Sequence, residues 1–324
     1  MRVLVTGGLG VNGSWVTRNL LNEGHEPIVF EARADYSLAP DIEGQFPLVL
    51  GDVADLDALV AACQNYRVER IVHLAALMPN DSQDRLRQGF IINALGAVNV
   101  FEAARQCDVQ RVVFTSSKSA YGRVPDTPYG PPEYTPIAET ATCDPVIAYD
   151  IEKFAAEVMA RNYQQNYGME IVSLRFGTIY APGKLARHGR MGLLAVMIEN
   201  ALAGVETSIP SGGDQVDDVM YVGDVARGIT LSLFAAPELE PMYNIATGYG
   251  TTPRQFAEAV RAVIPDAEIN VGPGMDYLGM GINYYSISDI SLAKRDLGYE
   301  PAYGLREGIE DYVATVRSLG LGAE

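Results

Sequence analysis

The chain has 324 residues, of which 48% are hydrophobic, so it is long enough for one large domain or two. Its 24 basic and 41 acidic residues give a net charge of −17, which argues against nucleic acid or an anionic membrane surface as a partner. No apolar run is long enough to predict a transmembrane helix, and because a strand is predicted from residue 2 onward we expect no signal peptide. Cys63, Cys107 and Cys143 are scattered without metal-ligand spacing. We therefore expect reduced thiols, no metal site and a cytoplasmic location.

A glycine-rich turn follows the first predicted strand. Residues 2–6 are apolar and rich in β-branched side chains, which predicts a buried parallel strand. Gly7, Gly10 and Gly13 follow at three-residue spacing, and a helix is expected over about 13–22. Such a turn brings backbone N–H groups and the positive end of a helix dipole against a pyrophosphate. The motif therefore predicts a dinucleotide site, in which Gly13 lets the helix pack closely on the sheet.

An acidic residue ends the second predicted strand, which covers residues 27–30. Glu31 lies 18 residues beyond Gly13, where a carboxylate is expected to bind the adenosine ribose hydroxyls. A carboxylate there would repel a 2′-phosphate, so the sequence favours NAD over NADP. Arg33 lies close enough in sequence to leave NADP open, and a glycine-rich turn with a surface glutamate is the simpler alternative.

Strand-like and helix-like segments alternate through the first half of the chain. Further strands are predicted at 46–50, 70–76, 111–115 and 170–175, and helices at 56–66, about 87–106 and 149–167. This alternation predicts an α/β fold with a doubly wound parallel sheet. The proline-rich stretch 122–145 has no periodicity, and a loop of that length in a compact domain is usually functional.

The second half of the chain is less regular. After Pro182 the pattern loosens, and residues 216–248 are expected to return to the main sheet. We therefore predict a cofactor-binding domain of residues 1–177 plus about 216–248. A smaller C-terminal substrate-binding domain is predicted over about 178–215 and 249–324, with helix over about 290–319.

Tyr149 and Lys153 lie one helical turn apart on the predicted helix 149–167, so they share a face. A tyrosine has a pKa of about 10, too high for a base at neutral pH, but a nearby ammonium and an oxidised nicotinamide both stabilise the phenolate. Ser117 follows the predicted strand 111–115, and strand carboxyl ends line the ligand crevice of such sheets. The three residues predict proton transfer coupled to hydride transfer. An amphipathic helix beside a serine turn is the alternative.

With these motifs in hand, the chain resembles the extended short-chain dehydrogenase/reductases, also called the NAD-dependent epimerase/dehydratase family. The resemblance covers nearly the whole length. It is carried by Thr6-Gly7-x-x-Gly10-x-x-Gly13, Gly51-Asp52, His73-Leu74-Ala75-Ala76, Ser116-Ser117-x-x-x-Tyr121-Gly122, Tyr149-x-x-x-Lys153, Leu174-Arg175-Phe176 and Tyr221-Val222-x-Asp224-Val225-Ala226.

The resemblance implies a Rossmann sheet, NAD as cofactor and a set of site residues. Ser117, Tyr149 and Lys153 match the family's catalytic triad, and Lys153 would also bind the nicotinamide ribose. The resemblance implies a cofactor-binding set of Gly7, Gly10, Val11, Gly13, Glu31, Asp52, Val53, Leu74, Ala75, Ala76, Asn93, Tyr149 and Lys153. It also implies a homodimer formed through the helices at about 87–106 and 149–167.

The departures from the family concern the substrate. Members that act on nucleotide sugars usually carry an asparagine where this chain has Thr178, and an arginine where it has Asp217. An acid beside a diphosphate is electrostatically adverse. The 4,6-dehydratases carry Asp-Glu where this chain has Lys118-Ser119. These differences argue against a dehydratase and, less directly, against a nucleotide-sugar epimerase.

Three functions remain open at this point. The first is an NAD-dependent oxidoreductase that takes hydride from a secondary alcohol of a small polar substrate, such as a sugar, a sugar acid or a hydroxy acid. The second is a nucleotide-sugar epimerase that uses the same triad, and the third is a non-catalytic NAD-binding sensor. Predicted substrate contacts are Lys118, Ser119, Thr178, Arg187 and Arg190, of which the last two belong to a basic segment.

Overall fold

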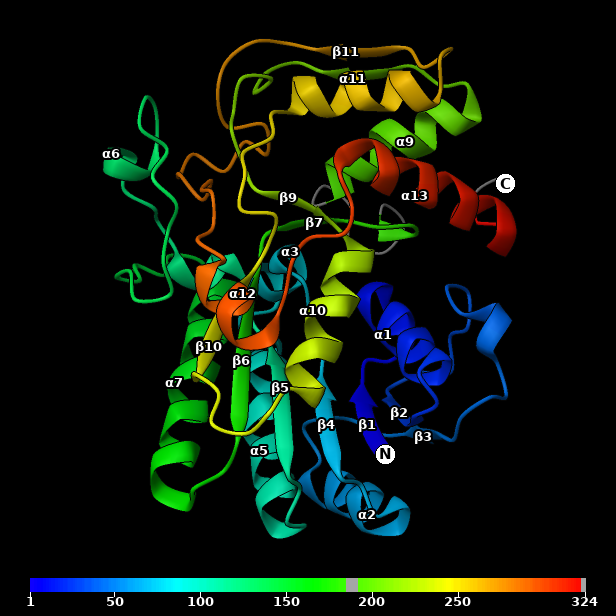
Figure 1. Cartoon of the computed structure of the whole chain (residues 1–324), viewed down its shortest axis with the longest axis vertical. Helices are drawn as coiled ribbons and strands as arrows, with labels where there is room; N and C mark the ends of the chain where they lie inside the picture. Colours follow the sequence, from blue (N-terminus) through cyan, green and yellow to red (C-terminus); the bar gives the residue numbers. More distant parts are fainter. Residues whose placement is uncertain (185–191, 322–324) are drawn as a thin grey trace.

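The computed structural model describes residues 1–184 and 192–321 and is built on a parallel sheet (Figure 1). Within these residues the sheet has seven strands in the order β10-β6-β5-β4-β1-β2-β3, and every pairing is parallel. Its strands are β1 (Arg2–Thr6), β2 (Glu26–Glu31), β3 (Leu48–Leu50), β4 (Arg70–His73), β5 (Arg111–Thr115), β6 (Ile171–Phe176) and β10 (Met242–Ile245). The order reverses between β1 and β4, which is where a doubly wound sheet forms its ligand crevice.

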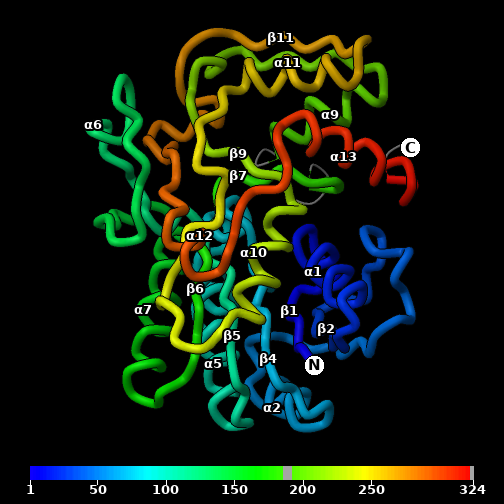
Figure 2. Tube along the Cα trace, viewed as in Figure 1, coloured from blue at the N-terminus to red at the C-terminus, as the bar shows by residue number. Residues whose placement is uncertain are grey.

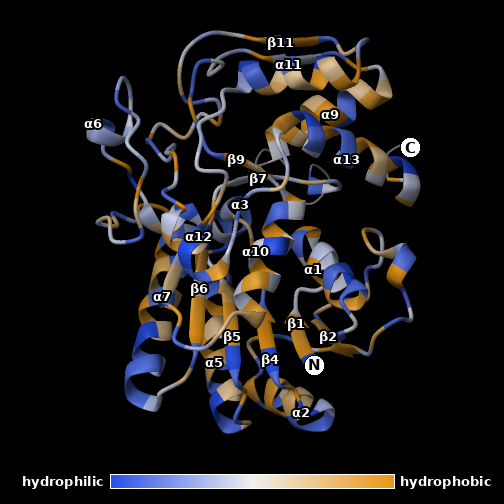
Figure 3. Ribbon diagram, viewed as in Figure 1, coloured by the Kyte–Doolittle hydropathy of each residue, from blue (hydrophilic) through white to orange (hydrophobic). Residues whose placement is uncertain are grey.

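Helices cover both faces of the sheet, as the alternating sequence predicts. One face packs against α2 (Leu56–Tyr66), α5 (Gly96–Gln106) and α7 (Ala148–Tyr167). The other packs against α1 (Val11–Asn22), α10 (Val222–Phe234) and α12 (Ser291–Leu297). The central strands are mostly apolar, as expected for strands buried on both faces, although β4 and β5 begin with Arg70 and Arg111 (Figure 3).

A second layer lies beyond the carboxyl ends of the strands, at the top of Figure 1. It contains two short parallel pairs, β7 (Thr178–Tyr180) with β9 (Val219–Tyr221), and β8 (Thr207–Ile209) with β11 (Ile269–Val271). The helices α9 (Leu193–Ala203), α11 (Pro253–Val263) and α13 (Leu305–Leu319) share an apolar core with these strands. The irregular sequence after Pro182 did not predict these pairs.

The chain crosses between the two layers several times (Figure 2). It leaves the sheet after β6, forms β7 and α9, and returns through α10 to β10, which pairs with β6. Of residues 216–248, which were expected to return to the main sheet, β10 does so, whereas β9 pairs with β7 in the second layer. It then forms α11 and β11 in the second layer before α12 packs on β10 and α10. The predicted helix 290–319 is therefore two helices, separated at Gly298 by a left-handed backbone with φ of 62°.

The predicted continuous helix 87–106 is also wrong in detail. It consists of α4 (Leu86–Gly89), a π-helical segment η2 (Phe90–Leu95) and α5. A π-helical turn inserts an extra residue, and such turns often occur at functional sites. The remaining short elements are η1 (Pro40–Ile42), α3 (Pro79–Asp84), η3 (Lys118–Tyr121) and α6 (Asp126–Tyr129).

None of the described helices combines the length and the apolar character that crossing a bilayer requires.

Candidate functional site

A cavity of about 830 Å³ lies at the carboxyl ends of the strands, between the sheet and the second layer. It runs from the glycine turn to the amino end of α7 and collects residues from both halves of the chain. It is lined by Gly7, Gly10, Val11, Gly13, Glu31, Asp52, Val53, Leu74, Ala75, Ala76, Ser117, Lys118, Ser119, Tyr149, Lys153 and Thr178, all of which the sequence predicted as site residues. Arg187 and Arg190 lie outside the described residues.

The glycine turn is too tight for any side chain. A Cβ added to Gly13 would lie 1.9 Å from the carbonyl oxygen of Gly7, and one added to Gly7 would lie 2.8 Å from the nitrogen of Ala75. Gly7 also has φ of +74°, a region that L-residues avoid. The backbone at the amino end of α1 is therefore exposed to the cavity without side chains in front of it. This fits a pyrophosphate, which needs close approach to backbone N–H groups.

The acid at the end of β2 lies beside this turn. Glu31 accepts a hydrogen bond of 2.9 Å from the backbone of Leu9, and this fixes its carboxylate against the glycine turn while the residue lines the cavity. Asp52 and Val53 line the same end, and the Asp52 carboxylate accepts from the backbone of Ala54 at 2.9 Å. The arrangement fits an adenosine, with acceptors for ribose hydroxyls beside an apolar wall. Arg33 lines this end as well.

Thr6 and His73 end the two strands that flank the switch point, and they face each other in register. The Thr6 hydroxyl lies 2.7 Å from His73 Nδ1. Burial, followed by the charge of Lys153, lowers the pKa of His73 to about 3, so the imidazole is neutral at ordinary pH. Nδ1 of a neutral ring either accepts from the threonine hydroxyl or donates to it, depending on the tautomer, and in both cases this contact joins β1 to β4 directly below the cavity.

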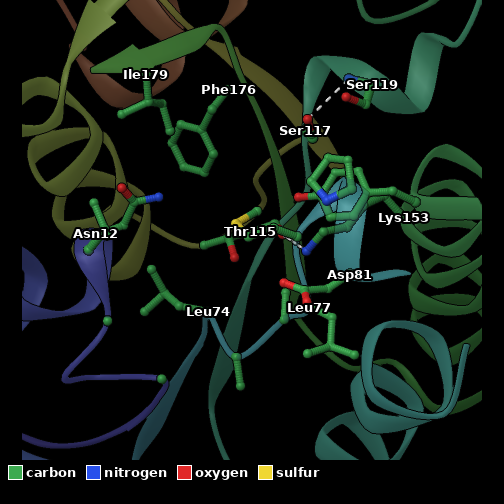
Figure 4. A pocket seen from close by; sticks show the side chains of 18 of the residues that line it. Asn12, Leu74, Leu77, Asp81, Thr115, Ser117, Ser119, Lys153, Phe176 and Ile179 are labelled. Atoms are coloured by element: carbon green, nitrogen blue, oxygen red, sulfur yellow. Dashed lines mark hydrogen bonds between the residues drawn. The ribbon is translucent and has the colours of Figure 1, made fainter. Parts of the chain in front are cut away.

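All three residues of the predicted triad line the cavity, and Figure 4 shows Ser117 and Lys153 close to each other. Lys153 is buried, and its ammonium donates to the carbonyl of Thr115 at 2.8 Å and lies 5.6 Å from the centre of the Tyr149 ring. Ser117 begins η3 and accepts from the backbone of Ser119 at 3.1 Å. Burial lowers the pKa of Lys153 to about 8, although Glu152 and Glu157 oppose this shift.

Tyr149 is buried, and its pKa is raised in the protein alone. Burial is the main cause, the charges of Glu152 and Asp150 add to it, and a hydrogen bond with Ser117 opposes it. A cation close to the phenolate would act in the opposite direction. The phenol therefore needs more positive charge beside it than the folded chain supplies before it can act as a base.

Asn93 lies behind the cavity wall, on the π-helical segment. Its side-chain amide bonds both backbone groups of Leu77, accepting from the nitrogen at 2.7 Å and donating to the oxygen at 2.9 Å. It also donates to Glu152 at 2.7 Å, and Glu152 accepts from the Ser82 hydroxyl at 2.6 Å. Asn93 thus joins the catalytic helix α7 to Leu77, which lines the cavity.

A buried carboxylate lies behind the part of the cavity wall that contains Lys118 and Thr178. Asp217 accepts from Lys118, from the Thr178 hydroxyl at 2.6 Å, from the Tyr277 hydroxyl at 3.1 Å and from the backbone of Asp218 at 3.0 Å. These four donors match the lone pairs of one carboxylate. Asp217 therefore holds Lys118 and Thr178, two predicted substrate contacts, in fixed positions.

The sequence did not predict that the tyrosines near the end of the chain reach this cavity. Tyr277, Tyr284 and Tyr285 all line it, although aromatic residues in such a stretch are more often packing residues. Tyr284 donates to Asp150 at 2.8 Å, which ties the segment to the first turn of α7. No local pattern marks these residues as lining the cavity, because the contacts that tie the segment there are distant in sequence: Tyr277 and Asp217 are 60 residues apart, and Tyr284 and Asp150 are 134 apart. Among the described residues, no group of three or more potential metal ligands occurs.

The sequence matches the model of the NAD dependent epimerase/dehydratase family over residues 3–246. It is 29% identical to a UDP-glucose 4-epimerase of Mycolicibacterium smegmatis, over 98% of this chain and 99% of that protein. Two solved structures are similar over 98% of this chain and 99% of theirs. One is a Thermus thermophilus UDP-glucose 4-epimerase in complex with NAD (32% identity, TM-score 0.81), and the other is a Thermotoga maritima UDP-glucose 4-epimerase with UDP-glucose (28%, 0.83).

The family match covers most of the chain, and the relatives match it from end to end. The predicted fold class and cofactor are confirmed, and the sensor alternative gives way to an enzyme. The chain belongs to the NAD-dependent epimerase/dehydratase family, and it is an NAD-dependent enzyme of the extended short-chain dehydrogenase/reductase type.

Proposed function

We propose that this enzyme oxidises a secondary alcohol of a small polar substrate, a sugar, sugar acid or hydroxy acid, and passes the hydride to NAD. One observation carries the proposal. Tyr149 and Lys153 on α7 meet Ser117 from the end of β5 in the cavity that also contains the glycine turn. A base, a hydroxyl donor and a dinucleotide cradle are therefore within reach of one substrate.

When bound, NAD⁺ supplies the hydride acceptor and a positive ring that favours the phenolate. Ser117 holds the substrate hydroxyl beside Tyr149, and the Tyr149 phenolate takes its proton as the carbon gives up hydride. The alcohol becomes a ketone, and the proton stays on the phenol. The Lys153 ammonium lowers the cost of the phenolate, because its positive charge lies against the ring.

The cofactor contacts follow from the wall of the cavity. The backbone after Gly7 and the amino end of α1 would bind the pyrophosphate, with Leu74 to Ala76 on its other side. Glu31 would accept from the adenosine ribose, with Asp52 and Val53 at the adenine. Asn93 would act through Leu77, whose backbone it holds. We further propose that the second layer forms the substrate-binding domain.

A nucleotide-sugar epimerase is the second candidate, because the relatives named above are UDP-glucose 4-epimerases. An epimerase would use the same triad but return the hydride to the other face of the bound ketone. The wall around Asp217 argues against it, because an acid stands where nucleotide-sugar members usually carry an arginine, and its ion pair with Lys118 reduces the positive charge available to a diphosphate.

The test is to incubate the purified protein with NAD and a panel of sugars, sugar acids, hydroxy acids and nucleotide sugars. We expect NADH to accumulate with a free acid or sugar and to disappear in Tyr149→Phe. Tyr167→Phe on the exposed part of the same helix is the matched control and should retain activity. A converted nucleotide sugar without net NADH would establish the epimerase instead.

We also propose a homodimer through α7 and the adjoining segment of α4 and η2, which pack against each other. Both carry exposed apolar side chains, namely Leu86, Phe90, Leu95, Ile151 and Met159. A monomer rarely leaves large apolar side chains exposed on two neighbouring helices. Sedimentation analysis should give a dimer that Phe90→Glu weakens, and a wild-type monomer would contradict the proposal.

A further inference from the structure

Two lysines line the substrate end of the cavity, and neither belongs to the triad. Lys118 lies in η3, directly after Ser117, and Lys184 follows β7. The Lys118 ammonium pairs with Asp217 and lies 5.7 Å from the centre of the Tyr285 ring. The Lys184 ammonium donates to the carbonyl of Ile179. Both ammonium groups are therefore held beside β7, because Asp217, which pairs with Lys118, also accepts from Thr178, and Lys184 donates to the adjacent Ile179.

The two lysines repel each other. Burial lowers the pKa of Lys184 to about 8, and the charge of Lys118 adds to this shift. The Lys184 ammonium donates to a carbonyl oxygen, and this oxygen carries no formal charge to balance the ammonium. Two cations held together in a partly buried site cost free energy unless an anion lies with them. The repulsion is therefore relieved by a ligand that brings negative charge.

Asp217 does not balance the charges of both lysines. Its two oxygens already accept four hydrogen bonds, from Lys118, Thr178, Tyr277 and the backbone of Asp218. It orients Lys118, whose ammonium has three hydrogens and therefore keeps donors for a ligand. Two ammonium groups and one carboxylate leave a single net positive charge in this cluster. A singly charged anion balances it, whereas a diphosphate would leave excess negative charge beside Asp217.

We propose that Lys118 and Lys184 bind a carboxylate of the substrate, so that the enzyme acts on a secondary alcohol of a sugar acid or another hydroxy acid. This inference rests on the proposed function and narrows its substrate class. Lys118 follows Ser117 in sequence, so the carboxylate would lie close to the carbon that loses hydride. Asp217 is a positioning residue, since it acts through Lys118 and Thr178.

The test measures binding rather than turnover, so it does not depend on hydride transfer. Calorimetric titrations of the NAD-bound protein compare carboxylates with neutral counterparts: D-glucuronate with D-glucose, D-galacturonate with D-galactose, D-gluconate with sorbitol, and lactate with propane-1,2-diol. We expect at least one carboxylate to bind with an affinity about 10- to 100-fold above that of its neutral counterpart. Glucose 6-phosphate and UDP-glucose are included to distinguish other anions.

The variants separate the lysines from the rest of the site. Lys184→Gln should remove the preference for the carboxylate, Lys184→Arg should retain part of it, and NAD affinity should change in neither. The double variant Lys118→Gln with Asp217→Asn removes both charges of that pair and should also lose the preference. Lys294→Gln, at an exposed lysine of α12, is the control. Tyr149→Phe should still bind the carboxylate substrate, even though this variant cannot oxidise the substrate's alcohol.

Three results would overturn the inference. They are equal binding of every carboxylate and its neutral counterpart, a carboxylate preference that survives Lys184→Gln, and tighter binding of UDP-glucose or glucose 6-phosphate than of any carboxylate. Net NADH formation that depends on Tyr149, seen together with any of these results, would leave the proposed oxidation intact and remove only the carboxylate site. Carboxylate binding without NADH formation would leave the carboxylate site intact and contradict the proposed oxidation.

Discussion

Lys153 donates a hydrogen bond of 2.8 Å from its ammonium group to the main-chain oxygen of Thr115, the last residue of β5. This bond fixes the amino-terminal half of α7 against the end of the strand that leads into Ser117. The lysine is buried and lies against the Tyr149 ring. One side chain therefore sets both the position of the catalytic helix and the charge beside the phenol.

Replacing Lys153 with methionine should remove that charge while keeping most of the side-chain volume. We expect kcat to fall about 100-fold, because proton transfer to a poorly stabilised phenolate is slow. The activity that remains should still be rising with pH at the ordinary tyrosine pKa of about 10, because burial raises the pKa of Tyr149, so the pH profile moves to the alkaline side. The measurement is kcat against pH for both proteins. A lower kcat with an unmoved profile would show that Lys153 acts by position alone.

Glu152 should be important for the stability of the folded protein. It is 1% exposed and accepts hydrogen bonds from Ser82 and Asn93. Glu152→Gln places an amide group against these donors, so we expect a loss of about 1–3 kcal/mol in the free energy of unfolding. Urea denaturation measures it, and Glu258→Gln at an exposed position of α11 is the control. Equal stability of the two variants would contradict the assigned role.

Gly13→Ala should weaken cofactor binding while the rest of the fold stays largely intact. The new Cβ would meet the Gly7 carbonyl at 1.9 Å, so the turn that faces the pyrophosphate must open. We expect the dissociation constant for NAD to rise at least about tenfold. At Gly304 an added Cβ meets the end of the Glu307 side chain, so Gly304→Ala is a suitable control. Fluorescence titration with NADH gives the dissociation constants of both variants. Similar constants would contradict the assignment of the glycine turn as the pyrophosphate site.

The neutral, buried His73 makes stability depend on pH. The folded-state pKa is lowered from 6.5 to about 3, so below pH 6.5 the unfolded chain takes up a proton that the folded chain does not. Stability is therefore lost as pH falls through this window, by about 1.4 kcal/mol per pH unit from this residue. Between about pH 7 and about pH 5, His73→Asn should lose about 2 kcal/mol less than the wild type in urea unfolding. Equal losses would show that His73 is protonated in the folded protein.

The parts of the site that the sequence predicted are those encoded over short distances. Gly7, Gly10 and Gly13 lie within one turn, and Tyr149 and Lys153 lie one helical turn apart, so spacing alone places each group. The parallel sheet was predictable for the same reason, because strands and helices alternate with clear hydrophobic periods. A helix interrupted by a π-helical segment has almost the period of an unbroken one, so the change at Phe90–Leu95 left no signal.

The parts that the sequence did not predict depend on contacts between distant residues. Lys118 and Asp217 are 99 residues apart, and Tyr284 and Asp150 are 134 apart. β8 and β11 have three residues each and gain their stability from the apolar core of the second layer, so neither has a distinct period of its own. We propose that the substrate is recognised in this part of the molecule, and its lack of a local sequence period explains why the cofactor was easier to predict than the substrate.

The most direct measurement follows a deuterium label placed on the carbinol carbon of the substrate that the panel identifies. Mass spectrometry of the released cofactor and of the sugar product shows where the label goes. The account predicts that the wild type transfers the label to the nicotinamide ring of NADH, which it releases together with an unlabelled ketone, and that Tyr149→Phe transfers almost none. Label that returns to the product with none in released NADH, or equal transfer by Tyr149→Phe, would contradict it.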